Sequence, residues 1–145
     1  MRFYGFDEFD KDMHALAAQI KENFKPDALL AIARGGLTIG HFIAMRLNMR
    51  EIFVMNSIHY EDTQKLEHIK LFNIPDLSAF KRVLILDDII DSGESMSEIK
   101  RVLQDKFKQT QFKIASIFYK EKALLEPDFK VQKTDEWIEF FWERV

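Results

Sequence analysis

The sequence contains no cysteine, only three prolines and five glycines in 145 residues, and no long hydrophobic run. Without cysteine, the chain has no disulfide, no thiolate nucleophile and no cysteine-ligated zinc. This composition fits a reducing compartment, and we expect a cytoplasmic protein. No apolar run approaches the roughly 20 residues that a membrane-spanning helix needs, so no membrane span is expected. Residues 1–10 mix charges and aromatics, which is not the pattern of a signal peptide.

An excess of positive charge is also missing. The 21 Lys and Arg residues are outnumbered by 24 Asp and Glu residues, which gives a net charge of −3 with neutral histidines. Surfaces that bind nucleic acids are usually basic, so nucleic acid is not among the expected partners. Apolar residues, in contrast, make up 47% of the chain, which is enough to build a core without covalent cross-links. We therefore expect a single domain over residues 1–145.

Hydrophobic spacing predicts alternating helices and strands. Apolar residues recur at three- and four-residue steps from Phe6 to Phe24, where Asp7 is the expected N-cap. Short apolar runs are typical of strands buried on both faces. The alternation favours an α/β fold with a mostly parallel sheet of about five strands flanked by helices, and with functional loops at the carboxyl ends of the strands. The expected strands are residues 28–33, 51–56, 69–72, 83–86 and 112–119; the expected helices are residues 6–24, 37–47 and 96–107; residues 57–67 are an expected loop, and residues 124–145 show little regular period.

The most informative segment follows the strand at residues 83–86. It has three acids and then two serines around a glycine at the start of a helix: Asp87, Asp88, Asp91, Ser92, Gly93 and Ser95. Gly93 permits backbone geometry that other residues avoid, and backbone N–H groups at a helix N-terminus bind anions such as phosphate. Acids repel phosphate but suit sugar hydroxyls and Mg²⁺. Any two of these residues are explained more simply as capping residues at the end of a strand. The whole run is better explained by function, and it predicts a site for a phosphorylated sugar with a metal.

The segment Leu84–Ser95 resembles the PRPP-binding motif of type I phosphoribosyltransferases, where PRPP is 5-phosphoribosyl-1-pyrophosphate. The resemblance implies the type I phosphoribosyltransferase fold. It implies that Asp87 and Asp88 serve the ribose hydroxyls and the cofactor Mg²⁺, with Asp88 as the metal ligand, and that Asp91–Ser95 hold the 5-phosphate. The Glu94 side chain is expected to point away from that phosphate. The PRPP site implied by this motif is Asp87, Asp88, Ile89, Ile90, Asp91, Ser92, Gly93, Glu94 and Ser95.

A second motif, Arg34-Gly35-Gly36, follows the strand at residues 28–33. Its backbone N–H groups and guanidinium could hold a diphosphate, and taken alone it is at least as compatible with a plain strand-to-helix turn. It resembles the pyrophosphate loop of purine phosphoribosyltransferases, which implies that Arg34 and Gly35 bind PRPP. Lys65 falls where enzymes of the xanthine-guanine type carry a basic residue near pyrophosphate, so it joins the expected PRPP site.

Three further residues could form a purine site. Lys120 follows the strand at residues 112–119, and Trp137 and Ile138 lie in an aromatic tail. Taken alone, a solvated lysine and an aromatic cluster that caps the core are the simpler interpretations, but a purine needs a flat side chain to stack on. Together with the two motifs, these segments resemble bacterial purine phosphoribosyltransferases of the xanthine-guanine type. The resemblance implies that Trp137 stacks on the base, that Ile138 offers backbone groups to its edge and that Lys120 contacts O6.

The same resemblance implies a hood and an assembly. Residues 121–145 would form a small C-terminal hood, residues 57–67 a lid, and the protein a homo-oligomer, either a dimer or a tetramer. Within the lid, Tyr60 matches a serine–tyrosine pair of the family and His59 departs from it. Glu143 lies near an acidic position that is associated with a second Mg²⁺.

The reaction implied by the resemblance is purine salvage. A 6-oxopurine (guanine, xanthine or hypoxanthine) joins PRPP, giving a nucleoside 5′-monophosphate and pyrophosphate. Asp91 is the expected catalytic base and a purine contact, and it would take a proton from N7 as N9 attacks. The alternative is a non-catalytic regulator of the same fold that senses PRPP or a nucleotide, although a PRPP sensor needs no purine platform such as Lys120 and Trp137. A receiver-like signalling domain is discounted, because Arg34 stands where such a domain would place its paired acids.

Overall fold

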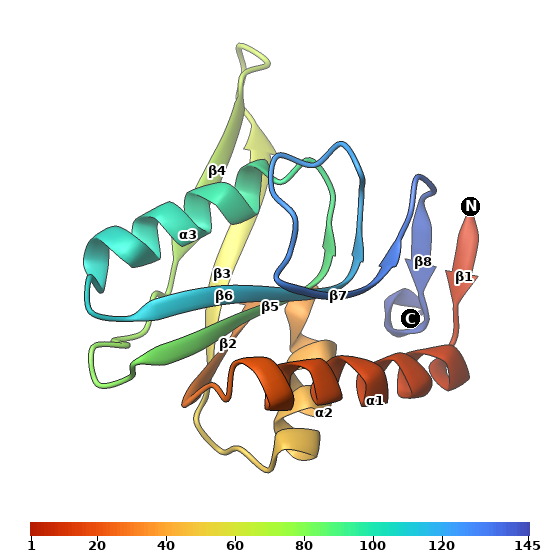
Figure 1. Ribbon diagram of the computed structural model, residues 1–145. Helices are drawn as coiled ribbons and strands as arrows, with labels where there is room; N and C mark the ends of the chain where they lie inside the picture. The colour runs from red at the N-terminus through yellow and green to blue at the C-terminus, as the bar shows by residue number, and fades with distance from the viewer.

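The computed structural model describes all residues, 1–145, as a mostly parallel sheet with helices on both faces (Figure 1). The main sheet has six strands in the order β4-β3-β2-β5-β6-β7, and a second sheet pairs β1 with β8. The expected α/β class is confirmed, with six strands in the main sheet where the sequence indicated about five. The strands are β1 (Arg2–Tyr4), β2 (Ala28–Ala33), β3 (Ile52–Glu61), β4 (Glu67–Phe72), β5 (Arg82–Ile90), β6 (Gln111–Tyr119), β7 (Phe129–Lys133) and β8 (Ile138–Phe140); the helices are α1 (Phe6–Asn23), α2 (Gly36–Leu47), α3 (Glu94–Lys106) and the 3₁₀ helix η1 (Phe141–Glu143).

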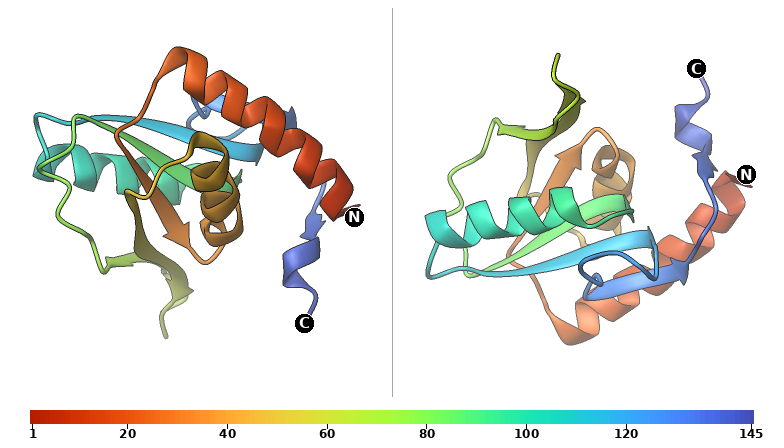
Figure 2. Two further views of the ribbon diagram at one scale, coloured as in Figure 1. Left: turned by 90° about the horizontal axis from the view of Figure 1, so that it is seen from below. Right: turned by 90° about the horizontal axis from the view of Figure 1, so that it is seen from above.

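The central strands are buried on both faces of the sheet. In β5, Leu84 and Leu86 belong to the core beneath α1 and α2, whereas Val83 and Ile85 belong to the core beneath α3. Figures 1 and 2 show α1 and α2 on one face and α3 on the other. This two-sided burial explains why β5 is a nearly continuous apolar run. No helix is both long and apolar enough to cross a membrane.

The direction of the strands positions the functional loops. Every pairing in the main sheet is parallel except that of β3 with β4. The strands β2, β5 and β6 are neighbours, so their carboxyl ends meet at one edge of the sheet. In parallel α/β sheets this edge is where ligands bind.

Residues 57–67 belong to a β-hairpin and not to the loop expected from their polarity. The strand β3 runs to Glu61 and β4 begins at Glu67, and at the tip Asp62 Oδ1 accepts the N–H of Leu66 at 3.0 Å. The hairpin arm, defined here as residues 57–72, projects beyond the rest of the sheet (Figure 1). Because the projecting strands have no buried face over most of their length, they need no alternation of apolar and polar residues. That lack of alternation made the expectation of a loop wrong.

The two ends of the chain are also more regular than expected. The strand β7 extends the main sheet, and β8 pairs in parallel with β1, aligning Tyr4 with Phe140. The buried Tyr4 hydroxyl donates to Asp12 of α1 at 2.6 Å, which ties this small sheet to the helix. The N-cap of α1 is Gly5, not Asp7, because Gly5 is the only residue between the end of β1 at Tyr4 and the start of the helix at Phe6.

Candidate active site

Two motifs far apart in the sequence lie against each other at the edge of the sheet. The turn Arg34–Gly36 follows β2, and Asp87 and Asp88 lie near the end of β5. A Cβ atom on Gly35 would lie 2.8 Å from Oδ1 of Asp87 and 2.7 Å from Oδ1 of Asp88. Only glycine allows the turn to approach the acids so closely. The turn that carries Arg34 and the two acids therefore lie side by side at the carboxyl ends of β2 and β5.

Asp87 and Asp88 form an acid pair with raised pKa values. Asp87 Oδ1 accepts the Asp88 N–H at 2.9 Å, and Asp88 Oδ1 accepts the Ile89 N–H at 2.7 Å. Burial raises the pKa of Asp87 well above its usual range, and the charge of Asp88 raises it further. Burial also raises the pKa of Asp88 to about 6, with the charge of Glu143 adding to the effect and hydrogen bonds opposing it. Negative charge on this buried pair is therefore unfavourable without a partner, and a divalent cation could neutralise it.

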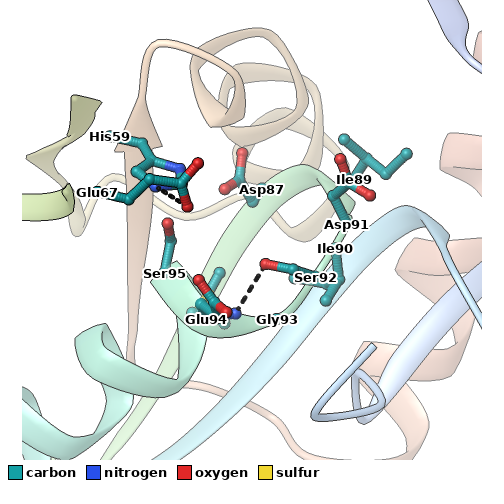
Figure 3. Close-up of a pocket in the computed structure, with 11 residues that line it drawn as sticks. His59, Glu67, Asp87, Ile89, Ile90, Asp91, Ser92, Gly93, Glu94 and Ser95 are labelled. Carbon is teal, nitrogen blue, oxygen red and sulfur yellow. Dashed lines mark hydrogen bonds and ion pairs between the residues drawn. The ribbon is translucent and has the colours of Figure 1, made fainter. Parts of the chain in front are cut away.

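A cavity of about 420 Å³ opens beside this pair (Figure 3). It is lined by residues 89–96, Asp87, and two residues of the hairpin arm, His59 and Glu67. Helix α3 begins at this cavity with Glu94, so the partial positive charge of a helix N-terminus faces it and favours an anion.

The loop before α3 is held in place by the segment that follows β6. The Leu124 N–H donates to the Ser92 carbonyl oxygen at 2.8 Å. Gly93 has a φ of +85°, and a Cβ atom there would lie 2.8 Å from the backbone nitrogen of Leu124. Both the left-handed backbone and the close approach require glycine at this position. The start of α3 is therefore tied to the segment that follows β6.

A second cavity of about 220 Å³ lies on the other side of Asp91 and Ile89, which line both cavities. Lys120 Nζ lies 2.8 Å from Asp91 Oδ1, so the lysine expected at the base is paired with the expected catalytic acid. Trp137 leaves 68% of its surface exposed, which does not fit an aromatic cap of the core and leaves its ring available for stacking. The other lining residues are Asp88, Glu136, Ile138, Phe140 and Glu143.

Not every expected residue lies at these cavities. Lys65 sits at the tip of the hairpin arm with a φ of +61° and lines neither cavity. Arg34 also lines neither, although its turn packs on the acid pair. Conversely, Glu67 and Glu136 line the first and the second cavity and were not expected as site residues. Glu67 reaches its cavity through the pairing of β3 with β4, which the sequence did not reveal.

Known proteins that are similar to this chain are phosphoribosyltransferases. The sequence matches the phosphoribosyl transferase domain over residues 6–144. The xanthine-guanine phosphoribosyltransferase of Idiomarina loihiensis is 22% identical over an alignment 146 positions long, which covers 97% of this chain and 86% of that protein.

Solved structures of two phosphoribosyltransferases superpose on this chain over nearly its whole length. The xanthine-guanine-hypoxanthine phosphoribosyltransferase of Helicobacter pylori superposes with a TM-score of 0.92 and 36% identity, covering 99% of this chain and 94% of that one. A purine phosphoribosyltransferase from Pyrococcus horikoshii superposes with a TM-score of 0.85 and 28% identity, covering 97% and 92% of the two chains. This chain therefore belongs to the phosphoribosyl transferase family.

Proposed function

We propose that the protein is a purine-salvage phosphoribosyltransferase that joins a 6-oxopurine to PRPP and releases pyrophosphate. The observation that carries the proposal is the pair of cavities that meet at Asp91. One is built from a helix N-terminus and suits a phosphate, and the other has an exposed tryptophan and suits a flat base. The relatives support a purine as the acceptor, since their names include xanthine, guanine and hypoxanthine.

The PRPP site would extend from the turn after β2 to the start of α3. Arg34 and the N–H groups of its turn would stabilise the negative charge that develops on pyrophosphate as the bond between C1′ and the leaving oxygen breaks. Residues 91–95 would hold the 5-phosphate, and Asp87 and Asp88 would serve the ribose hydroxyls. Lys65 would reach this site only if the hairpin arm moves toward it, as a closing lid does.

The base would react across the second cavity. As N9 of the purine bonds to C1′, the ribose carries oxocarbenium character, as in glycoside cleavage. Asp91 would accept the proton from N7, and Lys120 would donate a hydrogen bond to O6. Trp137 would stack on the ring, and the backbone of Ile138 would meet its edge. The 2.8 Å contact between Lys120 and Asp91 supports this assignment, because both groups already lie at the same end of the cavity.

Mg²⁺ fits the acid pair. The pair offers only oxygen ligands, which Mg²⁺ prefers, and a cation would offset the buried negative charge that is the reason for the raised pKa of Asp88. Asp88 would hold the ion, which when bound would neutralise charge on the leaving pyrophosphate. Glu143 lines the neighbouring cavity, and one of its oxygens accepts the Phe140 N–H at 3.0 Å. Its other oxygen would be left for a second ion.

The remaining expectations also belong to this proposal. The chain would act as one phosphoribosyltransferase domain in the cytoplasm, with residues 121–145 as a hood over the base. It would form a dimer or tetramer, which light scattering after gel filtration measures directly. No observation favours the alternative of a non-catalytic sensor.

The test is release of pyrophosphate from PRPP and Mg²⁺ with guanine, xanthine or hypoxanthine. We expect release only when a base is present, together with formation of the matching nucleoside 5′-monophosphate. A reaction without base measures hydrolysis of PRPP, and Asp91→Asn serves as the control for the site. Saturable binding of PRPP without release with any of the three bases would contradict the proposal and would favour the sensor.

A further inference from the structure

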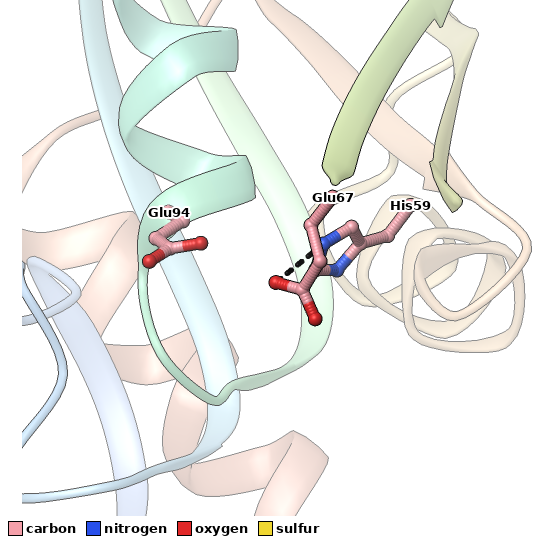
Figure 4. A group of neighbouring side chains, drawn as sticks. All are labelled: His59, Glu67 and Glu94. Carbon is pink, nitrogen blue, oxygen red and sulfur yellow. Dashed lines mark ion pairs between the residues drawn. The ribbon is translucent and has the colours of Figure 1, made fainter. Parts of the chain in front are cut away.

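Three side chains from three elements converge at the mouth of the larger cavity (Figure 4). His59 comes from β3, Glu67 from β4 and Glu94 from the start of α3. One donor atom of each lies within 4.8 Å of the donor atoms of the other two, and His59 Nε2 lies 3.4 Å from Glu67 Oε2. The register of the hairpin pairs His59 with Ile69, so His59 and Glu67 are diagonal neighbours on one face of the arm.

We propose that this trio binds one divalent transition metal of the zinc class. Two ligands that each lie about 2.0–2.1 Å from a tetrahedral zinc ion are roughly 3.4 Å apart, which is the distance between His59 Nε2 and Glu67 Oε2. Glu94 completes three protein ligands after a shift of its exposed side chain. The fourth position stays open to water or to another oxygen ligand, as it does in zinc sites with three protein ligands.

The donor set distinguishes this ion from the Mg²⁺ of the acid pair. An imidazole nitrogen suits zinc, cobalt or nickel, whereas Mg²⁺ prefers oxygen ligands alone. The chain has no cysteine that could capture such a metal elsewhere. No other group of three or more His, Asp or Glu donors gathers in the structure as closely as this one.

The charges that line the cavity of about 420 Å³ at the start of α3 indicate what the ion would do. Four carboxylates line that cavity, on Glu67, Asp87, Asp91 and Glu94, against a single histidine. The Glu94 carboxylate faces His59 and Glu67 at this cavity and does not point away from it as expected, so a phosphate held at the start of α3 would meet repulsion from Glu94 and Glu67. A cation bound by Glu67 and Glu94 would turn this repulsion of the phosphate into attraction. It would also join the hairpin arm to the start of α3. This role, unlike the metal site itself, rests on the proposed function.

A second histidine on the arm provides a matched control. His68 Nε2 lies 2.7 Å from Asp62 Oδ2, and His68 pairs with Tyr60, which places it on the opposite face from His59. His68 and Asp62 have no third His, Asp or Glu donor within reach. The two histidines are similarly exposed, with 44% and 41% of their side-chain surface accessible. Substituting His68 therefore removes one arm imidazole without touching the proposed site.

The experiment is a titration of metal-free protein with Zn²⁺ in competition with a chromogenic chelator, without PRPP or purine. We expect wild type to take one equivalent of Zn²⁺ at this site. His59→Ala and Glu94→Gln should each weaken that binding at least about tenfold, and His68→Ala should leave it unchanged. Because all three side chains are exposed, the variants should keep the wild-type melting temperature, which the same samples are used to check. Zn²⁺ binding that survives His59→Ala, as binding to the acid pair would, overturns the proposal, and so does a wild type that does not compete with the chelator.

The role of the ion is tested separately. In the turnover assay with excess Mg²⁺, added Zn²⁺ should lower the KM for PRPP in wild type and leave it unchanged in His59→Ala. Comparing the two proteins removes any effect of Zn²⁺ on PRPP itself or on the acid pair. An equal response of the two proteins overturns the role at the phosphate. The binding titration contains no substrate, so failure of the proposed enzyme activity would not affect its outcome.

Discussion

Replacing Asp88 by Asn should stabilise the free protein at neutral pH and abolish its expected metal-dependent turnover. The two side chains have nearly the same shape, and the Asn oxygen can still accept the Ile89 N–H, which Asp88 Oδ1 accepts at 2.7 Å. The substitution therefore removes little except a charge that the folded protein holds in an unfavourable place. Two neighbouring acids, Asp87 and Glu143, lose a source of repulsion at the same time.

The size of the effect follows from the pKa of Asp88, which burial raises from 3.8 to about 6. A difference of about two pKa units corresponds to about 3 kcal/mol, and because the side chain keeps some exposure to solvent we expect about 1–3 kcal/mol. Below pH 3.8 the carboxyl is protonated in both states and there is no penalty. Between pH 3.8 and 6 the unfolded chain loses the proton first, so the free energy of unfolding of wild type falls as the pH rises. Above pH 6 the full penalty applies.

Urea unfolding of wild type and Asp88→Asn at several pH values between 4 and 8 measures this difference. The variant should be more stable by about 1–3 kcal/mol at pH 7.5, or about 3–9 °C in melting temperature, and the difference should shrink toward pH 4. Asp76→Asn is the matched control, because hydrogen bonds from Ser78 lower the pKa of the exposed Asp76, so this substitution should give no gain. A variant that is less stable than wild type at pH 7.5, or a gain that does not change with pH, would refute the reasoning.

Four further substitutions test the site. Asp91→Asn should keep PRPP binding, measured by calorimetry, and reduce kcat by about 10²–10⁴ because the general base is lost; full activity would exclude Asp91 as that base. Lys120→Ala should raise the KM for every 6-oxopurine more than the KM for PRPP, and unchanged base kinetics would make Lys120 an ordinary surface lysine. Trp137→Ala should weaken base binding with little change in melting temperature, since the side chain is exposed; a large drop in melting temperature would show that it caps the core instead. Gly93→Ala should lower the free energy of unfolding by on the order of 1–3 kcal/mol because of its positive φ and the nearby backbone of Leu124, and a urea midpoint equal to that of wild type would contradict this.

The centre of the fold could be predicted because its physical constraints act locally. β5 is buried on both faces, so its residues Val83–Leu86 are all apolar, and the acids begin where the strand reaches the edge of the sheet. The turn Arg34–Gly36 follows β2 in the same way. Neither motif alone shows that they touch. That conclusion depends on β2 and β5 being neighbours in the sheet. Only the structure shows that Gly35 lies so close to the acids that a Cβ atom there would collide with them.

Of the hairpin arm only residues 69–72 were predicted as a strand, and residues 57–67 could not be recognised because their surroundings are the opposite of those of β5. Its strands are held by backbone hydrogen bonds between β3 and β4, and these bonds do not depend on side-chain identity. Both faces of the arm are largely open to solvent, so apolar and polar residues show no alternation there. As a consequence His59 and Glu67 could be recognised as neighbours of Glu94 only from the structure, because the pairing of the arm decides which face they share.

The wall of the second cavity depends on contacts between the two ends of the chain, and such contacts leave almost no trace in a sequence. The strands β1 and β8 have three residues each, which is too few for a period to be recognised. What holds them together is burial: Tyr4 and Phe140 lie edge to face with ring centroids 5.8 Å apart, and both are almost fully buried. Trp137 and Ile138 are carried by this pairing, since the Arg2 N–H donates to the Trp137 carbonyl oxygen at 3.0 Å. The position of the proposed purine platform is therefore set by the first residues of the chain, none of which lines the pocket.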